Sequence, residues 1–447
     1  MSPPAIRRGE GASLAHGRSG LPPSSVDRYG APVSTPRSAH EVDLTDLDRF
    51  INGFPHDVFA DLRRDTPVFW HEPTDHTPDG EGFWSVTSYA GAVGVLQDPK
   101  TFSSHTGGER GGGGTVLRDL PGAGKSLNMM DDPRHLQVRR LVGPRFRPEQ
   151  IARLELDLRA WTRTLLDRIA EKRECEFVSE VAAEVPIRGI SLVLGVPEEH
   201  GYRLAGLISS SLDFSNRQAF EATDEMAARM AEFDAVGDAL VAERRSRPGD
   251  DLLSVIARLD VPGGAPLDGQ EVALLFSLLF GAGTESTRNS TGMGLLGLIH
   301  QPEQYELLSR DPACLDAAVE EIVRWTSPSA YSRRTATRDT TFFDQRIRAG
   351  QKVVLWTASA NRDETVFADP MSLDVTRTPN PHLAFGAGIH HCIGAHLTRL
   401  ELKIVFEELA RRFERFELAG EPEWIRNNRN IGLRRLPVRF LARPVSG

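Results

Sequence analysis

The stretch from Leu267 to about His300 constrains the fold most strongly. It reads as one long helix with Asp268 as its N-cap, and apolar residues occupy nearly all of its faces. A helix of this kind is buried, so the rest of the chain must cover it. Gly281 and Gly283 interrupt its apolar pattern, and each costs about 1 kcal/mol relative to alanine. We therefore expect something flat to approach the helix closely at these glycines.

Composition excludes several classes of protein. Of the 447 residues, 62 are acidic and 53 are Lys or Arg, which gives a net charge of -9 and argues against nucleic-acid binding by bulk charge. Three cysteines far apart exclude a disulfide framework and a four-cysteine zinc site. The longest apolar stretch, 272–282, is well below the roughly 18 to 20 residues that cross a membrane. We expect no membrane span and a cytoplasmic location.

The remaining pattern predicts a mainly α fold with small β-sheets. Residues 1–42 are rich in Pro, Gly, Ser and Arg, which predicts a disordered leader before a single domain at 43–447. The runs 67–71 and 82–88 predict a hairpin, and 340–347 and 352–356 predict further strands. Helices are expected over most of 131–247, over 311–325 and from about residue 392. The sequence GAGKS at 122–126 lacks the first glycine of a phosphate-binding loop, because position 119 is aspartate.

One cysteine lies between a glycine-rich turn and a predicted amphipathic helix, in the segment FGAGIHHCIG at 385–394. The unpaired N–H groups at the start of that helix favour the thiolate of Cys392. The residues alone leave four interpretations open. Cys392 is a buried structural cysteine, a nucleophile, a metal ligand together with His390 and His391, or an axial ligand of haem iron.

This segment resembles the haem-binding loop of the cytochrome P-450 superfamily, in which a phenylalanine opens the loop and a cysteine ligates iron. The resemblance covers about residue 43 to the C-terminus. It implies a single-domain cytochrome P-450 fold, a triangular helical prism around haem b (heme b, iron protoporphyrin IX). Cys392 is then the axial thiolate and the metal ligand. The other loop positions that the resemblance assigns to the cofactor are Phe385, Gly386, His390 and Gly394.

Three further motifs match the family in order and spacing. Asp132-Pro-Arg-His135 followed by Arg139, and Arg334 in the run 333–338, correspond to haem propionate donors. Glu321 and Arg324, with Arg377 before the loop, correspond to a structural network. Without the resemblance, the motif at 132–139 indicates a solvated helix face. Glu321 and Arg324 would then form a surface ion pair that contributes under about 1 kcal/mol.

The third motif, AGTEST at 282–287, corresponds to the oxygen-activating part of the long helix. The resemblance places Ala282 against the haem and predicts a bulge at Gly283, where O2 binds, with Glu285 and Ser286 supplying protons. Serine stands where the family usually has threonine, with Thr287 next to it. The resemblance also predicts lids at 106–120 and 209–220. The predicted substrate pocket is lined by Leu278, Gly281, Ala282, Ser329, Ala330 and Tyr331.

The resemblance therefore implies a bacterial haem-dependent monooxygenase that hydroxylates, or otherwise oxidises, a hydrophobic small molecule. A terpenoid, steroid or other natural-product intermediate is the expected substrate. Electrons would come from a ferredoxin and an NAD(P)H-dependent ferredoxin reductase, because the chain shows no flavin fingerprint or iron–sulfur cysteine cluster. Arg139, Arg140, Arg145, Arg399 and Lys403 are the candidate docking cations. We expect a monomer. Alternatives are a β-hydroxylase of a carrier-bound aminoacyl group, a peroxide-driven peroxygenase and a haem-binding sensor without turnover.

Overall fold

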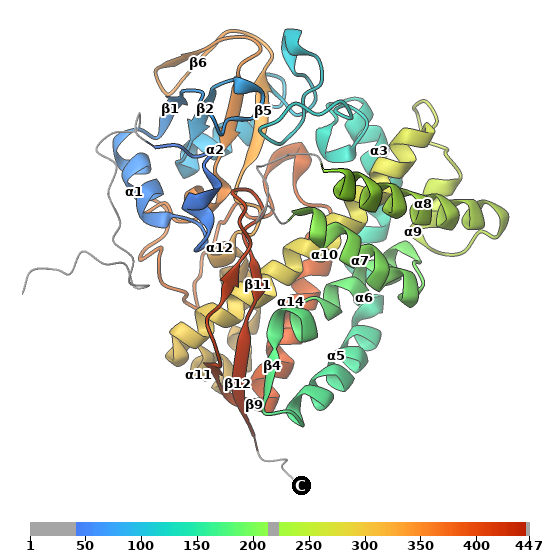
Figure 1. Ribbon diagram of the computed structural model, residues 1–447, viewed down its shortest axis with the longest axis vertical. Helices are drawn as coiled ribbons and strands as arrows, with labels where there is room; N and C mark the ends of the chain where they lie inside the picture. Colours follow the sequence, from blue (N-terminus) through green and yellow to red (C-terminus); the bar gives the residue numbers. More distant parts are fainter. Residues whose placement is uncertain (1–41, 213–222, 444–447) are drawn as a thin grey trace, which may run out of the picture. The chain divides into compact units, whose positions relative to one another are not determined.

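The computed structural model describes residues 42–212 and 223–443, and its central element is the predicted long helix. This helix, α10 (Gly269–His300), runs through the middle of the helices in Figure 1. Asp268 accepts a hydrogen bond from the backbone N–H of Glu271, and the Glu271 side chain accepts one from the backbone N–H of Asp268. This capping box satisfies two N–H groups at the start of the helix and fixes where it begins.

Other helices cover α10 on several sides. A Cβ atom on Gly283 would lie 2.7 Å from Ile190 Cγ1, and one on Gly294 would lie 2.8 Å from Ile322 Cγ2 and 2.9 Å from Phe406 Cζ. Glycine at these positions therefore lets three neighbouring helices approach the backbone. The helices packed around α10 are α6 (Glu184–Leu194), α7 (Glu198–Leu212), α8 (Asp224–Ser246), α9 (Leu252–Ala257), α11 (Pro302–Arg310), α12 (Leu315–Thr326) and α14 (Ala395–Arg412). Helix α5 (Glu155–Ala170) packs outside them, against α6 and α14.

The approach at Gly283 corrects one expectation from the sequence. The missing side chain of Gly283 faces α6, so close packing of two helices accounts for this glycine. The helix also continues without a break from Gly269 to His300, where a bulge was predicted. Thr284 donates a hydrogen bond to the Phe280 carbonyl and Ser286 donates one to Ala282. These bonds satisfy the two hydroxyl groups within the helix itself.

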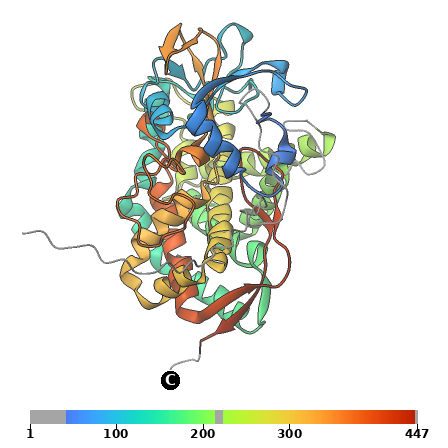
Figure 2. The same ribbon diagram turned by 90° about the vertical axis from the view of Figure 1, so that its left-hand side faces the viewer.

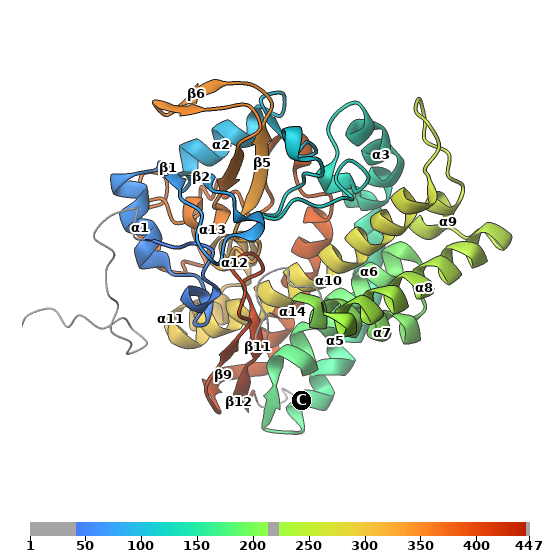
Figure 3. The same ribbon diagram turned by 45° about the horizontal axis from the view of Figure 1, so that its top comes forward.

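A five-stranded sheet lies on one side of α10 and the helices α5–α9 lie on the other (Figure 3). The predicted hairpin is confirmed as β1 and β2, which pair antiparallel with Trp70 opposite Trp84. Strand β8 pairs parallel with β2 and antiparallel with β5, which brings Arg334 opposite Val353. The sheet has the order β1 (Val68–His71), β2 (Phe83–Val86), β8 (Lys352–Leu355), β5 (Ser332–Ala336) and β3 (Phe102–Ser103).

The smaller sheets are formed mainly by the C-terminal part of the chain. Figure 2 shows the red C-terminal strands at the opposite end from the blue and orange strands of the large sheet. One sheet has the order β4 (Glu174–Glu176), β12 (Pro437–Ala442) and β9 (Phe413–Leu418). The two-stranded sheets pair β6 (Thr340–Phe342) with β7 (Gln345–Ile347) and β10 (Glu423–Trp424) with β11 (Leu433–Arg435). The short helices are α1 (His56–Asp65), α2 (Tyr89–Gln97), α3 (Arg134–Val142), α4 (Pro148–Ile151), α11 (Pro302–Arg310) and α13 (Thr357–Ala360).

The architecture agrees with the expected mainly α fold with small sheets. The GAGKS segment forms turns followed by a short 3₁₀ turn at 127–129, and Lys125 forms an ion pair with Asp268, which agrees with rejecting a phosphate loop. Within the described ranges, no helix is both long and apolar enough to cross a bilayer. The predicted leader, and most of the second predicted lid, lie outside the described residues.

Candidate functional site

The cysteine loop is a tight turn closed onto the start of α14. The Cys392 N–H donates to the Phe385 carbonyl at 2.8 Å, and Gly386 and Gly388 have φ angles of 68° and 69°. Left-handed backbone of this kind favours glycine. Gly394 is the N-cap of α14, and the backbone N–H groups of Gly394 and Ala395 act to lower the pKa of Cys392. The loop therefore presents the sulfur beside the positive end of a helix.

Cys392 differs from the other two cysteines in its surroundings. Cys175 and Cys314 are buried, and Cys314 Sγ bonds to the Asp311 carbonyl at 3.0 Å, whereas Cys392 is exposed. Burial of the thiol nevertheless raises the pKa of Cys392, and the Gly394 N–H only partly offsets this. The helix terminus alone does not produce the thiolate predicted from the sequence. An additional positive charge, such as a metal ion, would favour it.

Four predicted propionate donors lie together beside this loop. The rings of His135, on α3, and His390 are 4.2 Å apart between centroids, and the Nε2 atom of each is buried with no hydrogen-bond partner. Arg139, one turn after His135, donates to the His391 carbonyl at 2.6 Å. Arg334 on β5 is also buried, and its recorded hydrogen bonds go to Ser332 Oγ and the Arg333 carbonyl, which are neutral acceptors.

The charges of this donor set explain what it can bind. Burial, reinforced by Arg334, lowers the pKa of His390 to about 2. Burial lowers the pKa of Arg334 to about 10 and also lowers the pKa of His135. Asp132 lies 3.3 Å from His135 Nδ1, and Asp131 acts on Arg334 and His135 from nearby. The two imidazole Nε2 atoms nevertheless stay buried without a partner, and carboxylate groups would satisfy them together with the guanidinium groups. Two unpartnered imidazole nitrogens and two guanidinium groups next to Cys392 are the donors expected for haem propionates.

The residues predicted to handle oxygen and protons lie on one segment of α10. Ala282 is exposed and Ser286 half-buried, whereas Glu285 and Thr287 are buried. Glu285 forms an ion pair with Arg288 at 2.9 Å, and Arg288 also donates to the Leu433 carbonyl. The carboxylate is therefore held by an arginine that the sequence analysis did not assign.

A buried acid missing from the sequence analysis lies next to this segment. Glu401, on α14, is fully buried, and neither of its oxygens has a hydrogen-bond partner. Burial raises the pKa of Glu401 well above its ordinary value, with Thr287 as the polar side chain acting against that shift. Thr287 in turn lies 3.3 Å from Thr398, between their hydroxyl oxygens. The sequence did carry a signal for this residue. An acid between Leu397 and Ile404, on the apolar face of a predicted helix, indicates a buried carboxyl group.

The predicted structural network is present as a set of contacts. Glu321 and Arg324 are both fully buried and pair at 2.7 Å, and Arg377 reaches Glu321 at 3.1 Å. Glu320, the neighbouring residue, binds Arg399 at 2.5 and 2.9 Å. The Arg399 guanidinium also lies 4.4 Å from the centroid of the Phe385 ring. Arg399 is therefore held against the cysteine loop, although the sequence predicted a docking residue there.

The structure differs from the prediction for part of the substrate pocket. Leu278 and Gly281 are half-buried on α10, and Ser329 is exposed. Ala330 and Tyr331 are fully buried, and the Tyr331 ring packs 5.1 Å from Trp356 between centroids. These two residues present no surface to a ligand, because the large sheet and α13 pack over them.

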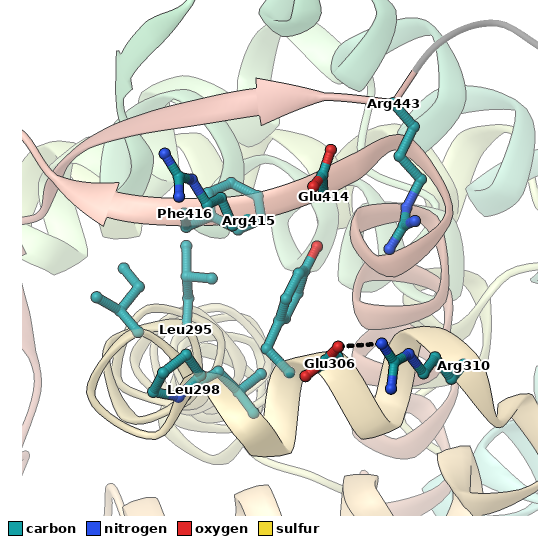
Figure 4. A pocket seen from close by; sticks show the side chains of 11 residues that line it. Leu295, Leu298, Glu306, Arg310, Glu414, Arg415, Phe416 and Arg443 are labelled. Atoms are coloured by element: carbon teal, nitrogen blue, oxygen red, sulfur yellow. Dashed lines mark ion pairs between the residues drawn. The ribbon is translucent and has the colours of Figure 1, made fainter.

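A separate surface pocket of about 350 Å³ lies away from these residues, between the end of α10, α11 and β9 (Figure 4). Apolar side chains such as Leu295 and Leu298 form its floor, while Arg310, Arg415 and Arg443 lie at its margin. None of the residues that line this pocket belongs to the predicted site.

In the described part of the chain, no group of three His, Cys, Asp or Glu residues is arranged to hold a metal ion, which disfavours the His390–His391–Cys392 metal site.

Comparisons with known proteins agree with this arrangement. The model of the cytochrome P450 family matches residues 313–442. Cytochrome P450 126 of Mycobacterium tuberculosis (strain CDC 1551 / Oshkosh) is 49% identical over 409 residues, which cover 91% of this chain and 99% of that protein. Linalool 8-monooxygenase of Pseudomonas putida is 34% identical over 410 residues, with coverages of 89% and 98%. The solved structure of Mycobacterium marinum cytochrome P450 CYP268A2 in complex with pseudoionone matches with a TM-score of 0.79 and 34% identity, covering 86% of this chain and 94% of that one.

The chain belongs to the cytochrome P450 family of haem-thiolate monooxygenases. Members of this family use haem b with a cysteine as the axial ligand. The expected fold class, enzyme class and cofactor are thereby confirmed.

Proposed function

We propose that the protein hydroxylates a hydrophobic small molecule, such as a terpenoid, with Cys392 as the ligand of the haem iron. The observation that carries this assignment is the contrast among the three cysteines. Only Cys392 is an exposed cysteine, lies at the start of a helix and has two buried, unpartnered imidazole nitrogens in the neighbouring donor set. Cys175 and Cys314 are packed in the core.

Each residue of the site has a defined task. Cys392 would ligate the iron, and His135, Arg139, Arg334 and His390 would bind the propionates. When bound, haem supplies the binding and reductive activation of O2. Phe385 accepts the Cys392 N–H and, with Arg399 against its ring, holds the loop in place. The protein thereby fixes the position of the sulfur before any ligand binds.

Protons would be delivered from side chains on α10 and α14. Glu285 is held in an ion pair by Arg288, and an ion-paired carboxylate carries no proton. Glu285 would therefore have to leave Arg288 and take up a proton from water before passing it on. The Ser286 hydroxyl currently donates to the Ala282 carbonyl and can turn away from it. Burial raises the pKa of Glu401 well above its ordinary value, which favours the protonated form of this acid next to Thr287. We infer that both acids supply protons to this part of the helix.

A reduced ferredoxin, regenerated by an NAD(P)H-dependent reductase, would donate electrons at the face that carries α3 and the cysteine loop. Arg140 is exposed there. Arg145, Arg399 and Lys403 already pair with Asp250, Glu320 and Asp316. Arg140 is therefore the strongest docking candidate. Because the reaction depends on NAD(P)H and a soluble electron carrier, we propose the cytoplasm as its compartment.

The ligand assignment is tested by the spectrum of the reduced, CO-bound protein. Wild type should show the strongly red-shifted Soret band of a thiolate ligand, and Cys392→Ala should lose it. Cys175→Ala and Cys314→Ala are matched controls that should retain it. A red-shifted band that survives in Cys392→Ala, or that disappears in Cys314→Ala, would reject the assignment.

The substrate class is tested by the shift of the ferric haem spectrum on adding ligands. Two similar proteins carry terpenoid-related names, one as linalool 8-monooxygenase and one in complex with pseudoionone. Linalool should therefore produce a saturable shift, followed by a hydroxylated product when a ferredoxin and its reductase are added. Binding of a steroid but not of linalool would replace the terpenoid with a larger ring system as the substrate class.

A further inference from the structure

Asp119, Arg333 and Lys352 form a buried cluster of charges outside the cysteine site. Arg333, on β5, is fully buried and its Nη1 lies 2.8 Å from Asp119 Oδ1. Lys352, on the adjacent strand β8, is 1% exposed and its Nζ lies 3.5 Å from Asp119 Oδ2. Because buried cations are costly unless paired, Asp119 holds the segment that carries it against these two strands.

The hairpin between β1 and β2 completes the cluster. Lys352 Nζ is 3.2 Å from Asp79 Oδ2 and 3.3 Å from Glu81 Oε2. The Asp119 N–H also donates to Asp79 at 2.9 Å. Three acids from two separate segments thus surround two buried cations on neighbouring strands. The cluster joins the loop at residue 119 to the sheet through both side-chain and backbone bonds.

Arg333 also fixes the backbone before Asp119. Its N–H donates to the Thr115 carbonyl at 2.9 Å, and its Nη1 donates to the Val116 and Leu117 carbonyls at 3.3 and 3.4 Å. Residues 111–114, directly before this segment, are four glycines with positive φ. Four glycines with left-handed backbone are therefore followed by 115–117, whose carbonyls all accept from Arg333, and by Asp119, which pairs with Arg333 and Lys352.

The held segment lies between the sheet and the distal helix. The Leu117 N–H donates to the Tyr331 hydroxyl at 3.4 Å, and a Cβ atom on Gly122 would lie 3.4 Å from Leu274 Cδ1. Leu274 and the predicted pocket residue Leu278 are one turn apart on α10 and both are half-buried. The loop thus spans from β5 to the face of α10 that carries the predicted pocket.

The geometry points to Arg333, Lys352 and Asp119 as positioning residues that hold the buried segment 115–119. They thereby make the adjoining residues 120–122, which reach α10, a fixed wall beside the predicted substrate pocket, and they confine loop opening to the glycines and the residues before them. A fixed wall favours ligands that match its shape, so the cluster sets substrate selectivity. The wall's role toward a substrate rests on the proposed function, whereas its rigidity does not.

Hydrogen exchange measured by mass spectrometry on the haem-loaded protein tests the rigidity. Asp119→Asn keeps the side-chain shape but removes the charge that both cations face. Peptides covering 113–122 should exchange at least tenfold faster, while peptides of α5 and α14 stay within twofold of wild type. Lys352→Met removes the cation that faces Asp119 and should likewise speed exchange at 113–122. Unchanged exchange in both variants, or an equal increase across the whole chain, would overturn the proposal.

Lys125→Gln is the matched control, since it removes an ion pair from the same loop. Lys125 pairs with Asp268 at 2.8 Å, but both side chains are about half exposed. Exposed pairs contribute little, so exchange at 113–122 should stay within twofold. A Lys125→Gln effect as large as that of Asp119→Asn would overturn the claim that the buried cluster holds the wall.

Selectivity is measured with two probes, linalool and progesterone, through the shift of the ferric haem spectrum. The ratio of their dissociation constants should change at least fivefold in Asp119→Asn and remain unchanged in Lys125→Gln. An unchanged ratio despite faster local exchange would reject the selectivity role. Loss of the thiolate assignment would leave the exchange result standing, so the two failures are distinguishable.

Discussion

Arg333 and Arg334 are consecutive residues on β5, and both are buried, but they have opposite electrostatic surroundings. Arg333 lies 2.8 Å from Asp119. Arg334 faces the other side of the strand, where its hydrogen-bond acceptors are neutral, Asp131 acts on it only from a distance, and burial lowers its pKa to about 10. A buried cation that pairs with an acid of the chain has a structural task, and one that does not marks a place for an external anion. The Glu321 network belongs to the first kind.

Removing the acid from the Glu321 network should have the largest effect. Glu321→Gln leaves Arg324 fully buried without its carboxylate and also removes the partner of Arg377. We expect a loss of about 3 to 5 kcal/mol in the free energy of unfolding, measured with urea. Haem binding should weaken only through this loss of stability. A loss under about 1 kcal/mol would show that the network is not a case of paired buried charges.

Replacing Arg334, the arginine without an acidic partner, should have the opposite effect on stability and stabilise the protein without haem. At pH 7 Arg334 is protonated in the folded and unfolded chain, so lowering its pKa from 12.5 to about 10 costs the folded state up to about 3 kcal/mol. Arg334→Gln should therefore raise the stability of the haem-free protein while weakening haem retention at least tenfold. Arg333→Gln should lower stability instead. Equal effects of the two variants would remove the distinction between them.

Glu320 also pairs with an arginine, but its contribution to stability should be smaller than that of Glu321 and should depend on pH. Burial alone would raise the pKa of Glu320, but hydrogen bonds from Arg399 and His382 outweigh it and lower the pKa to about 2. The carboxylate therefore stabilises the fold above pH 4.5, and this stability is lost as the pH falls toward 2. Glu320→Gln should cost about 2 kcal/mol at pH 7, less than the full shift because the side chain is 30% exposed. The difference from wild type should vanish near pH 2.

Asp316→Asn is the control for Glu320, because its partner Lys403 is also a cation of α14. The Asp316 side chain is 81% exposed, so the variant should change stability by under about 0.5 kcal/mol at any pH. A pH-independent loss in Glu320→Gln, or a comparable loss in Asp316→Asn, would contradict the role of the buried ion pair.

The sequence allowed prediction of the elements whose signal is local. The apolar pattern and Asp268 located α10, and the spacing of aromatic and turn residues located the β1–β2 hairpin. The cysteine loop could be recognised because its motif occupies ten consecutive residues around Cys392. Local patterns could not show that Gly283 faces Ile190 or that Tyr331 is covered by Trp356, because these contacts join segments far apart in the chain. Contacts of Asp119 and Glu401 were missed for the same reason.

The smallest effect on stability, and the most specific effect on the reaction, is expected at the buried acid Glu401. Neither of its carboxyl oxygens has a hydrogen-bond partner, and burial raises its pKa, so Gln matches the favoured protonated form in size and charge. Glu401→Gln should change the free energy of unfolding by under about 1 kcal/mol, because no ion pair is removed. If the acid supplies protons beside Thr287, the variant should release more hydrogen peroxide per NAD(P)H consumed. Ser286→Ala should do the same through the loss of its hydroxyl. Suppose that Ser286→Ala releases more hydrogen peroxide per NAD(P)H than wild type but Glu401→Gln does not. Glu401 would then be a packing residue without a role in proton supply. The contrast between paired and unpaired buried charges would then not apply to the proton path.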